Sequence, residues 1–164
     1  MSFEFTTTYD KRTMINMSRA TQKTINGAKT FQTISVFIAV MFTVFLLRDI
    51  SNPFNIGVFV IAYMPFFYFM FWYKMNAFLI YRKFGPITIK NIFTEENYTS
   101  DKNGGYFVMN YDDITDVCED KTHFFLIYGN SAGLSLDKSS VSEDTLTEFR
   151  KFITGKTGKP IVEL

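Results

Sequence analysis

Residues 31–47 read FQTISVFIAVMFTVFLL and residues 54–73 read FNIGVFVIAYMPFFYFMFWY, and neither stretch contains a charged side chain. At a helical rise of about 1.5 Å per residue, the two stretches would extend over about 26 Å and about 30 Å, which matches the hydrocarbon core of a bilayer. The connecting residues include Asn52 and Pro53, which are typical of a tight turn. The sequence therefore predicts a transmembrane helical hairpin, and two buried helices of a water-soluble core are the alternative interpretation.

The overall composition excludes several classes of protein. The chain has 164 residues, of which 47% are hydrophobic and 18% aromatic, with one Cys and one His. One Cys excludes an intramolecular disulfide framework, and one Cys with one His leaves no zinc cluster of three or four such ligands. The 17 basic and 16 acidic residues argue against nucleic-acid binding, because neutralising phosphates needs a surplus of Lys and Arg. The composition therefore points to a single domain's worth of chain without structural zinc.

The distribution of charge predicts an orientation for the hairpin. Residues 1–30 carry five basic and two acidic side chains, and residues 74–90 carry four basic and no acidic ones. The connection balances Arg48 with Asp49. Basic residues are enriched on the cytoplasmic side of membrane spans. We therefore expect a multi-pass membrane protein, with two spans and both termini in the cytoplasm.

The predicted fold class is an α+β membrane protein in three parts. Residues 1–30 are expected to form an N-terminal strand and a basic amphipathic helix. Residues 31–84 are expected to form the transmembrane hairpin, with spans at about 31–47 and 54–73. Residues 85–164 are expected to form a small cytoplasmic antiparallel sheet or barrel that is capped by one C-terminal helix.

Alternating apolar and polar residues predict the strands of this last part. Asn103-Gly104 is a strong hairpin signal, and Ser140 with Glu143 fits a capping box at the start of the helix, which Gly155 ends. The expected strands cover residues 87–93, 96–100, 106–111, 114–119, 123–128 and 132–137.

A group of acidic residues is the densest charged feature of the second half of the chain. It could be a calcium site, an acidic docking surface for a basic partner, or an ordinary solvated strand face. The glycine and the spacing of a calcium loop are missing. The group consists of Asp112, Asp113, Asp116, Glu119 and Asp120.

No pattern of catalytic residues is visible in the sequence. His123 begins an apolar strand, and Cys118 occupies an inward-facing strand position that is typical of a structural thiol. We therefore expect no enzyme activity, no catalytic residue, no cofactor and no metal. The basic helix near the N-terminus is expected either to bind anionic lipid headgroups or to be a solvated face. Its basic residues are Lys11, Arg12, Arg19 and Lys23.

Two stretches carry a resemblance to a known family. YDDITDVCEDKTHFFLIY at residues 111–128 and SLDKSSVSEDTLTEFRKFI at residues 135–153 resemble the bacterial YcxB-like membrane proteins. The shared pattern is an aromatic residue, an acid-hydrophobic pair, an acid, a strand that ends in tyrosine, a basic or serine turn, and Phe-Arg in a final helix. Here these are Tyr111, Asp113-Ile114, Glu119, Phe125 to Tyr128, Lys138-Ser139 and Phe149-Arg150. The resemblance implies a pleckstrin-homology-like C-terminal domain, a sheet capped by one helix.

These observations predict a non-enzymatic integral membrane protein that acts by protein–protein interaction. One version is a self-immunity factor against a bacteriocin or toxin, and the alternative is an accessory or regulatory subunit of a transporter or cell-envelope complex. The expected partners are the lipid bilayer and a membrane protein or toxin, with no nucleic acid. The candidate protein-binding face consists of Tyr106, Tyr111, Asp112, Asp113, Asp116 and Glu119.

Overall fold

The computed structural model of the protein describes most of the chain, with gaps at residues 1, 25–27, 49–51, 103–104 and 130–131. For a further set of helical residues it describes the backbone but not the side chain: 28–32, 45–46, 48, 62, 65–66 and 69–70.

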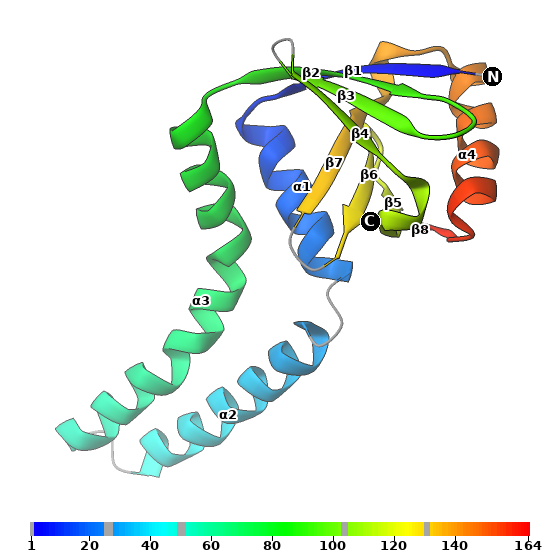
Figure 1. The fold of residues 1–164 in the computed structure, drawn as a ribbon. Coiled ribbons are helices and arrows are strands. Elements are labelled where there is room, and N and C mark those ends of the chain that lie inside the picture. The colour runs from blue at the N-terminus through cyan, green and yellow to red at the C-terminus, as the bar shows by residue number, and fades with distance from the viewer. Residues whose placement is uncertain (1, 25–27, 49–51, 103–104, 130–131) are drawn as a thin grey trace.

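The chain begins with a strand and three helices and continues with a β-rich second half (Figure 1). The first part consists of β1 (Phe3–Tyr9), α1 (Lys11–Thr24), α2 (Ala28–Arg48) and α3 (Pro53–Phe84). The second part consists of β2 (Ile87–Phe93), β3 (Tyr98–Lys102), β4 (Gly105–Met109), η1 (Tyr111–Asp113), β5 (Ile114–Glu119), β6 (His123–Tyr128), β7 (Ala132–Asp137), η2 (Lys138–Ser140), α4 (Glu143–Thr157) and β8 (Ile161–Glu163).

The strands form two four-stranded sheets, ordered β1-β2-β3-β4 and β7-β6-β5-β8. Neighbouring strands are antiparallel except β5 and β8, which are parallel. The N-terminal strand β1 pairs with β2 over its whole length, from Phe3 opposite Phe93 to Tyr9 opposite Ile87. β1 also joins the two sheets, because the Ser135 backbone N–H on β7 donates to the Tyr9 hydroxyl at 2.7 Å.

An aromatic cluster fills the interior of this two-sheet domain. Phe149 of α4 is fully buried, and its ring lies 4.7 Å from that of Phe5 and 5.1 Å from that of Phe93. α4 is fixed at both ends: the Ser142 side chain accepts a hydrogen bond from the Thr145 N–H, and Gly158 adopts a left-handed conformation with φ 65°. Such caps satisfy backbone groups that have no partner within the helix. The helix therefore closes the core from one side (Figure 1).

The helix α1 lies beside the second sheet and links it to α3. Asp10 caps α1 by accepting from the Thr13 N–H at 2.7 Å, and this bond is the largest cause of a lowered Asp10 pKa. Met14 and Ala20 of α1 and Ala77 of α3 are buried. The end of α3 nearest Gly85 therefore belongs to the packed domain.

The rest of α3 runs beside α2 away from the domain (Figure 1). We call α2 and α3 the helical pair. The Thr43 and Tyr63 hydroxyls join the two helices at 2.7 Å. α3 begins where the Asn52 side chain accepts from the Phe54 N–H, and it ends at Gly85, which has φ 67°. Part of the predicted turn, residues 49–51, lies outside the described residues.

The predicted membrane topology is wrong. Of the helices in the described ranges, none combines the length and the apolarity that crossing a membrane requires. The membrane hairpin of the predicted fold class, with spans at 31–47 and 54–73, is therefore not supported, nor is a two-span protein of the bacterial cell membrane with cytoplasmic termini. The prediction rested on two uncharged, mainly apolar stretches, in which polar residues such as Ser35 and Thr43 on α2 and Asn55 on α3 lie among the apolar ones. The α+β composition of the fold is as expected.

Candidate functional site

The six residues of the predicted binding face do not lie on one surface. Tyr111 is buried, and its hydroxyl donates to the Thr94 carbonyl oxygen at 2.6 Å. Burial raises the pKa of Tyr111 to about 12, and the bond to the Thr94 backbone acts in the opposite direction. Tyr111 therefore anchors η1 to the loop between β2 and β3 and is not available to a partner.

Glu119 is also occupied within the fold. Its carboxylate accepts from the Lys138 amine at 2.5 Å and from the Arg150 guanidinium at 2.5 Å, which connects β5 to η2 and α4. Partial burial acts to raise the pKa of Glu119, but the hydrogen bonds from Arg150 and Lys138 outweigh it and hold this pKa below its usual range. An ionised Glu119 is therefore a structural link between elements.

The remaining residues of the predicted face lie nearer the surface. Asp112 and Asp113 are exposed on η1, and Asp113 accepts from the Asn110 N–H at 3.4 Å. Asp116 is half-buried on β5. Tyr106 lies on β4 with 71% of its surface exposed. Tyr106, Asp112 and Asp113 thus remain candidates for contact with a partner.

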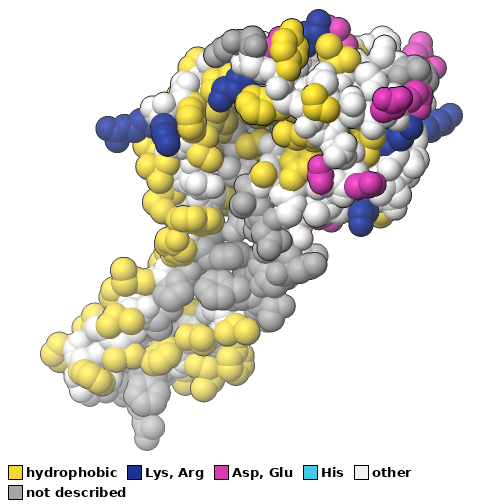
Figure 2. All heavy atoms as spheres, viewed as in Figure 1, with side chains coloured by type: hydrophobic (Ala, Val, Ile, Leu, Met, Phe, Trp, Pro, Cys, Tyr) yellow, Lys and Arg dark blue, Asp and Glu magenta, His cyan; other side chains and the backbone are white. Residues whose placement is uncertain are grey.

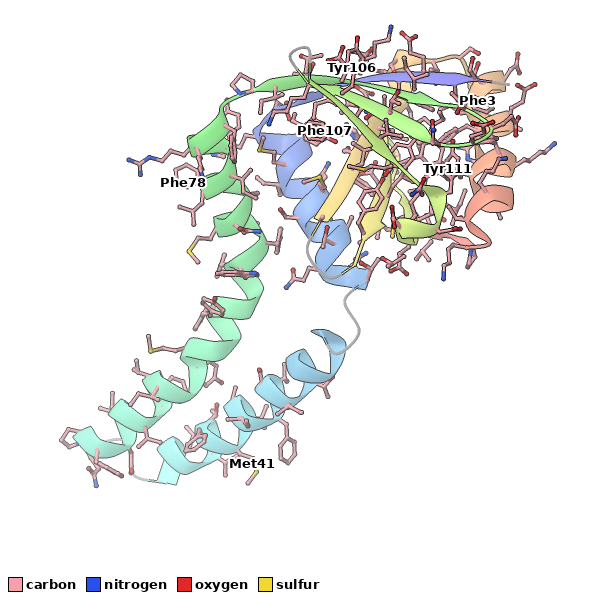
Figure 3. All side chains as sticks on the ribbon, viewed as in Figure 1. Phe3, Met41, Phe78, Tyr106, Phe107 and Tyr111 are labelled. Atoms are coloured by element: carbon pink, nitrogen blue, oxygen red, sulfur yellow. The ribbon has the colours of Figure 1, made fainter. Side chains whose placement is uncertain are left out.

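The strand β4 exposes apolar side chains on both of its faces. Its residues Phe107 and Val108 are 57% and 63% exposed, next to the exposed Tyr106. Successive side chains of a strand point to opposite faces. Figure 3 shows Tyr106 and Phe107 on opposite sides of the strand. The prediction missed Phe107 and Val108, although three consecutive large apolar residues after a hairpin signal were a visible clue.

Most of the exposed large hydrophobic side chains among the described residues lie on the helical pair. Ser35 and Ala39 are the buried residues of α2 among the described side chains. The opposite side of α2 exposes Ile34, Phe37, Met41 and Val44, with exposed fractions of 51%, 66%, 57% and 65%. This spacing of three and four residues places the four side chains in one line along the helix. We call this line the α2 seam.

α3 carries an apolar groove of its own. The groove has a volume of about 530 Å³ and is almost wholly apolar. Its lining residues are Phe59, Val60, Tyr63, Met64, Phe67 and Tyr68. Figure 2 shows hydrophobic side chains over the helical pair, whereas charged side chains gather over the two-sheet domain and the adjoining end of α3. The apolar surface of the pair is therefore distinct from the polar surface of the domain.

The basic residues of α1 have varied surroundings. Lys11 lies over the Phe78 ring at 5.6 Å from its centroid, and Arg12 borders an open polar groove of about 730 Å³. Arg19 and Lys23 are exposed further along α1. The polar groove also contains Asp10 and Asp137, which cap α1 and η2. Its opposite charges are therefore largely balanced.

The chain's single histidine and cysteine do not form a catalytic pair. The Nδ1 atom of His123 lies 2.8 Å from the Thr122 hydroxyl, in a turn held by Asp120. Cys118 is fully buried, and desolvation by burial raises the pKa of its thiol to about 11. A thiol with a raised pKa is a poor nucleophile. Across the described ranges, no cluster of three or more His, Cys, Asp or Glu side chains is placed to hold a metal ion.

The comparison with protein families concerns the second half of the chain. Residues 93–153 match the family model of the YcxB-like protein. This YcxB-like region runs from the last residue of β2 into α4 and includes the stretches 111–128 and 135–153 on which the resemblance was based. The resemblance is confirmed for this region, while the helical pair lies outside it. No curated protein and no solved structure matches the chain.

Proposed function

We propose that this protein is a non-enzymatic interaction protein whose helical pair binds an apolar helix of another protein. The α2 seam is the observation that carries the proposal. Monomeric proteins rarely expose contiguous apolar patches of more than a few hundred Å², and larger patches mark interaction sites. Four aligned and more than half-exposed side chains on α2 form an apolar line, and α3 carries an apolar groove of its own.

The chemistry of the surface defines the partner. No charged residue occurs between Lys29 and Arg48 or between Asp49 and Lys74. A charged partner segment would therefore lose its hydration without gaining a counter-charge, which is costly. Side chains spaced by three and four residues interdigitate with those of a second helix. We therefore assign an uncharged apolar helix as the occupant of the α2 seam.

The two-sheet domain is the second part of the proposal. We propose that its two sheets and C-terminal helix form a pleckstrin-homology-like domain that serves as a scaffold rather than as an enzyme. His123 and Cys118 are both engaged in the fold, which supports a non-enzymatic role. In this proposal the domain packs against the C-terminal part of α3 around the buried Ala77. The part of the helical pair that lies away from the domain is then free to bind its partner.

The proposal is tested by photo-crosslinking in cells of the source organism, with a photoreactive amino acid at Phe37. We expect an adduct that maps to an uncharged helical segment of a protein, and we expect Met41→Glu to abolish it. The matched control is Val162→Glu, because Val162 is also exposed and apolar but lies on β8. Adducts with lipid alone, or an adduct equally sensitive to both substitutions, would contradict the proposal.

The identity of the adduct also separates the biological settings. If the crosslinked protein is a toxin or the target of a toxin, and if cells that lack this chain are sensitive to that toxin, the interaction serves self-immunity. A stoichiometric transporter or envelope component would make the protein an accessory subunit instead.

A further inference from the structure

One line of exposed side chains on α3 is apolar at its start and basic at its end. Its members follow one another at steps of three or four residues, so they share one side of the helix. All of them are exposed, and Met64 is the most exposed at 64%. We call this set the α3 line. It consists of Val60, Met64, Phe67, Phe71, Lys74, Phe78 and Arg82.

The α3 line lies apart from the contacts that α3 makes within its own chain. Tyr63 faces α2 through the contact of its hydroxyl with that of Thr43, and Ala77 is buried. Neither residue belongs to the line. Alternating steps of three and four residues are the spacing at which one helix packs along another. The α3 line therefore has the pattern of a helix-packing seam, and the described elements leave it uncovered.

The basic side chains at the end of the line have no ion-pair partner in the described part of the chain. The ammonium group of Lys74 lies 5.8 Å from the centroid of the Phe71 ring, and that of Lys11 on α1 lies over the Phe78 ring. Residues 74–90 contain no acidic residue. A carboxylate along this end of the line would therefore meet cations that no other group neutralises. The ion pairs of the described residues involve other basic side chains, namely Lys90, Lys138, Arg150 and Lys156.

We propose that the α3 line binds a helix of another protein that is apolar where it faces residues 60–71 and acidic where it faces residues 74–82. Charge complementarity selects this occupant, because carboxylates two helical turns apart would lie opposite Lys74 and Arg82. A carboxylate between them would lie beside Lys11. The α3 line is separate from the α2 seam, whose four residues carry no charge. The protein thus has two docking surfaces for partner segments of different chemistry.

Lys83 distinguishes a partner helix from a lipid surface. It follows Arg82 in the sequence, but successive residues lie about 100° apart around a helix axis, so Lys83 is not on the line. Its ammonium group lies 5.2 Å from the centroid of the Phe84 ring. An anionic lipid surface attracts all nearby exposed basic side chains. A helix along the α3 line would instead contact Arg82 and leave Lys83 in water.

Binding of two synthetic helical peptides to the purified full chain tests the proposal. One half of both peptides is apolar, and the other half carries glutamates at steps of three and four residues or glutamines at the same positions. We expect fluorescence anisotropy to show about tenfold tighter binding of the glutamate peptide. Lys74→Glu combined with Arg82→Glu should remove this preference. The matched control Lys83→Glu should keep it.

Photo-crosslinking tests the direction of the bound helix. A photoreactive amino acid at Met64 should label the apolar half of the glutamate peptide, and one at Phe78 should label the glutamate half. Equal affinity for the two peptides, loss of the preference in Lys83→Glu, or reversed labelling would overturn the proposal. Binding of phosphatidylglycerol vesicles without binding of the glutamate peptide would overturn it as well. Met41→Glu alters the α2 seam and should leave peptide binding unchanged, so the two proposals fail separately.

Discussion

In the core of the two-sheet domain phenylalanine rings contact one another, whereas several phenylalanines of the helical pair face outward. Phe5, Phe93 and Phe149 are fully buried and lie within 6.0 Å of each other by ring centroid. Phe37 and Phe54, by contrast, are among the most exposed hydrophobic side chains described. Burial of apolar surface is the main favourable term in folding. The domain therefore obtains this energy from its own chain, while the helical pair leaves much of its apolar surface exposed.

The largest expected effect comes from removing a ring at the centre of the domain. Phe149→Ala should lower the free energy of unfolding by about 3–5 kcal/mol, because it leaves a cavity among four other phenylalanine rings. Phe37→Ala is the matched control and should change it by less than about 0.5 kcal/mol. Denaturant unfolding followed by circular dichroism measures both. Similar losses for the two variants would mean that the helical pair is as self-contained as the domain.

An intermediate effect is expected at Glu119. Glu119→Gln leaves Lys138 and Arg150 without their counter-charge and should lower the free energy of unfolding by about 2 kcal/mol at pH 7. Because the folded pKa of Glu119 is lowered, its contribution is complete above the ordinary value of 4.5 and is lost as the pH falls through the folded pKa.

The pH dependence provides the check on this assignment. Between about pH 5 and pH 3 the wild type should lose stability more steeply than Glu119→Gln. Glu148→Gln, at an exposed position of α4, should keep the wild-type slope. Parallel curves for wild type and Glu119→Gln would show that the ion pairs do not contribute to stability.

The smallest effect separates two tyrosines of the predicted face. Tyr111→Phe removes the hydrogen bonds from the hydroxyl to the Thr94 and Asn97 carbonyl oxygens and should cost about 1 kcal/mol. Tyr106→Phe should be neutral for the stability of the monomer, because this side chain is exposed. Thermal unfolding at low protein concentration measures the difference. Equal effects would place Tyr111 on the surface as well.

Local patterns were sufficient to predict much of the domain. The strands β2, β5, β6 and β7 have the predicted bounds, since each is an alternating or continuous apolar stretch between turn residues. β8 was missed because three residues that pair in parallel with β5 have no local signature. The capping residue of α4 is Ser142 and not Ser140, because Asp137 first directs the chain into η2.

The candidate site was harder to predict because its residues depend on distant partners. Tyr111 and Glu119 look like surface residues in sequence, but Tyr111 bonds to Thr94 and Glu119 to Arg150, which are far away along the chain. The uncharged and mainly apolar residues 31–47 were interpreted as a membrane span, which the described helices do not support. The exposed α2 seam has a visible spacing, but only packing shows which side of α2 faces α3.

A crosslinking scan along α2 tests the central claim most directly. A photoreactive amino acid is placed in turn at each residue from 34 to 44, and the yield of protein adducts is measured at each position. Packing against one partner helix predicts maxima at residues 34, 37, 41 and 44 and minima at residues 35 and 39, which face the fold. A uniform yield at all exposed positions, or adducts that contain no protein, would contradict the account.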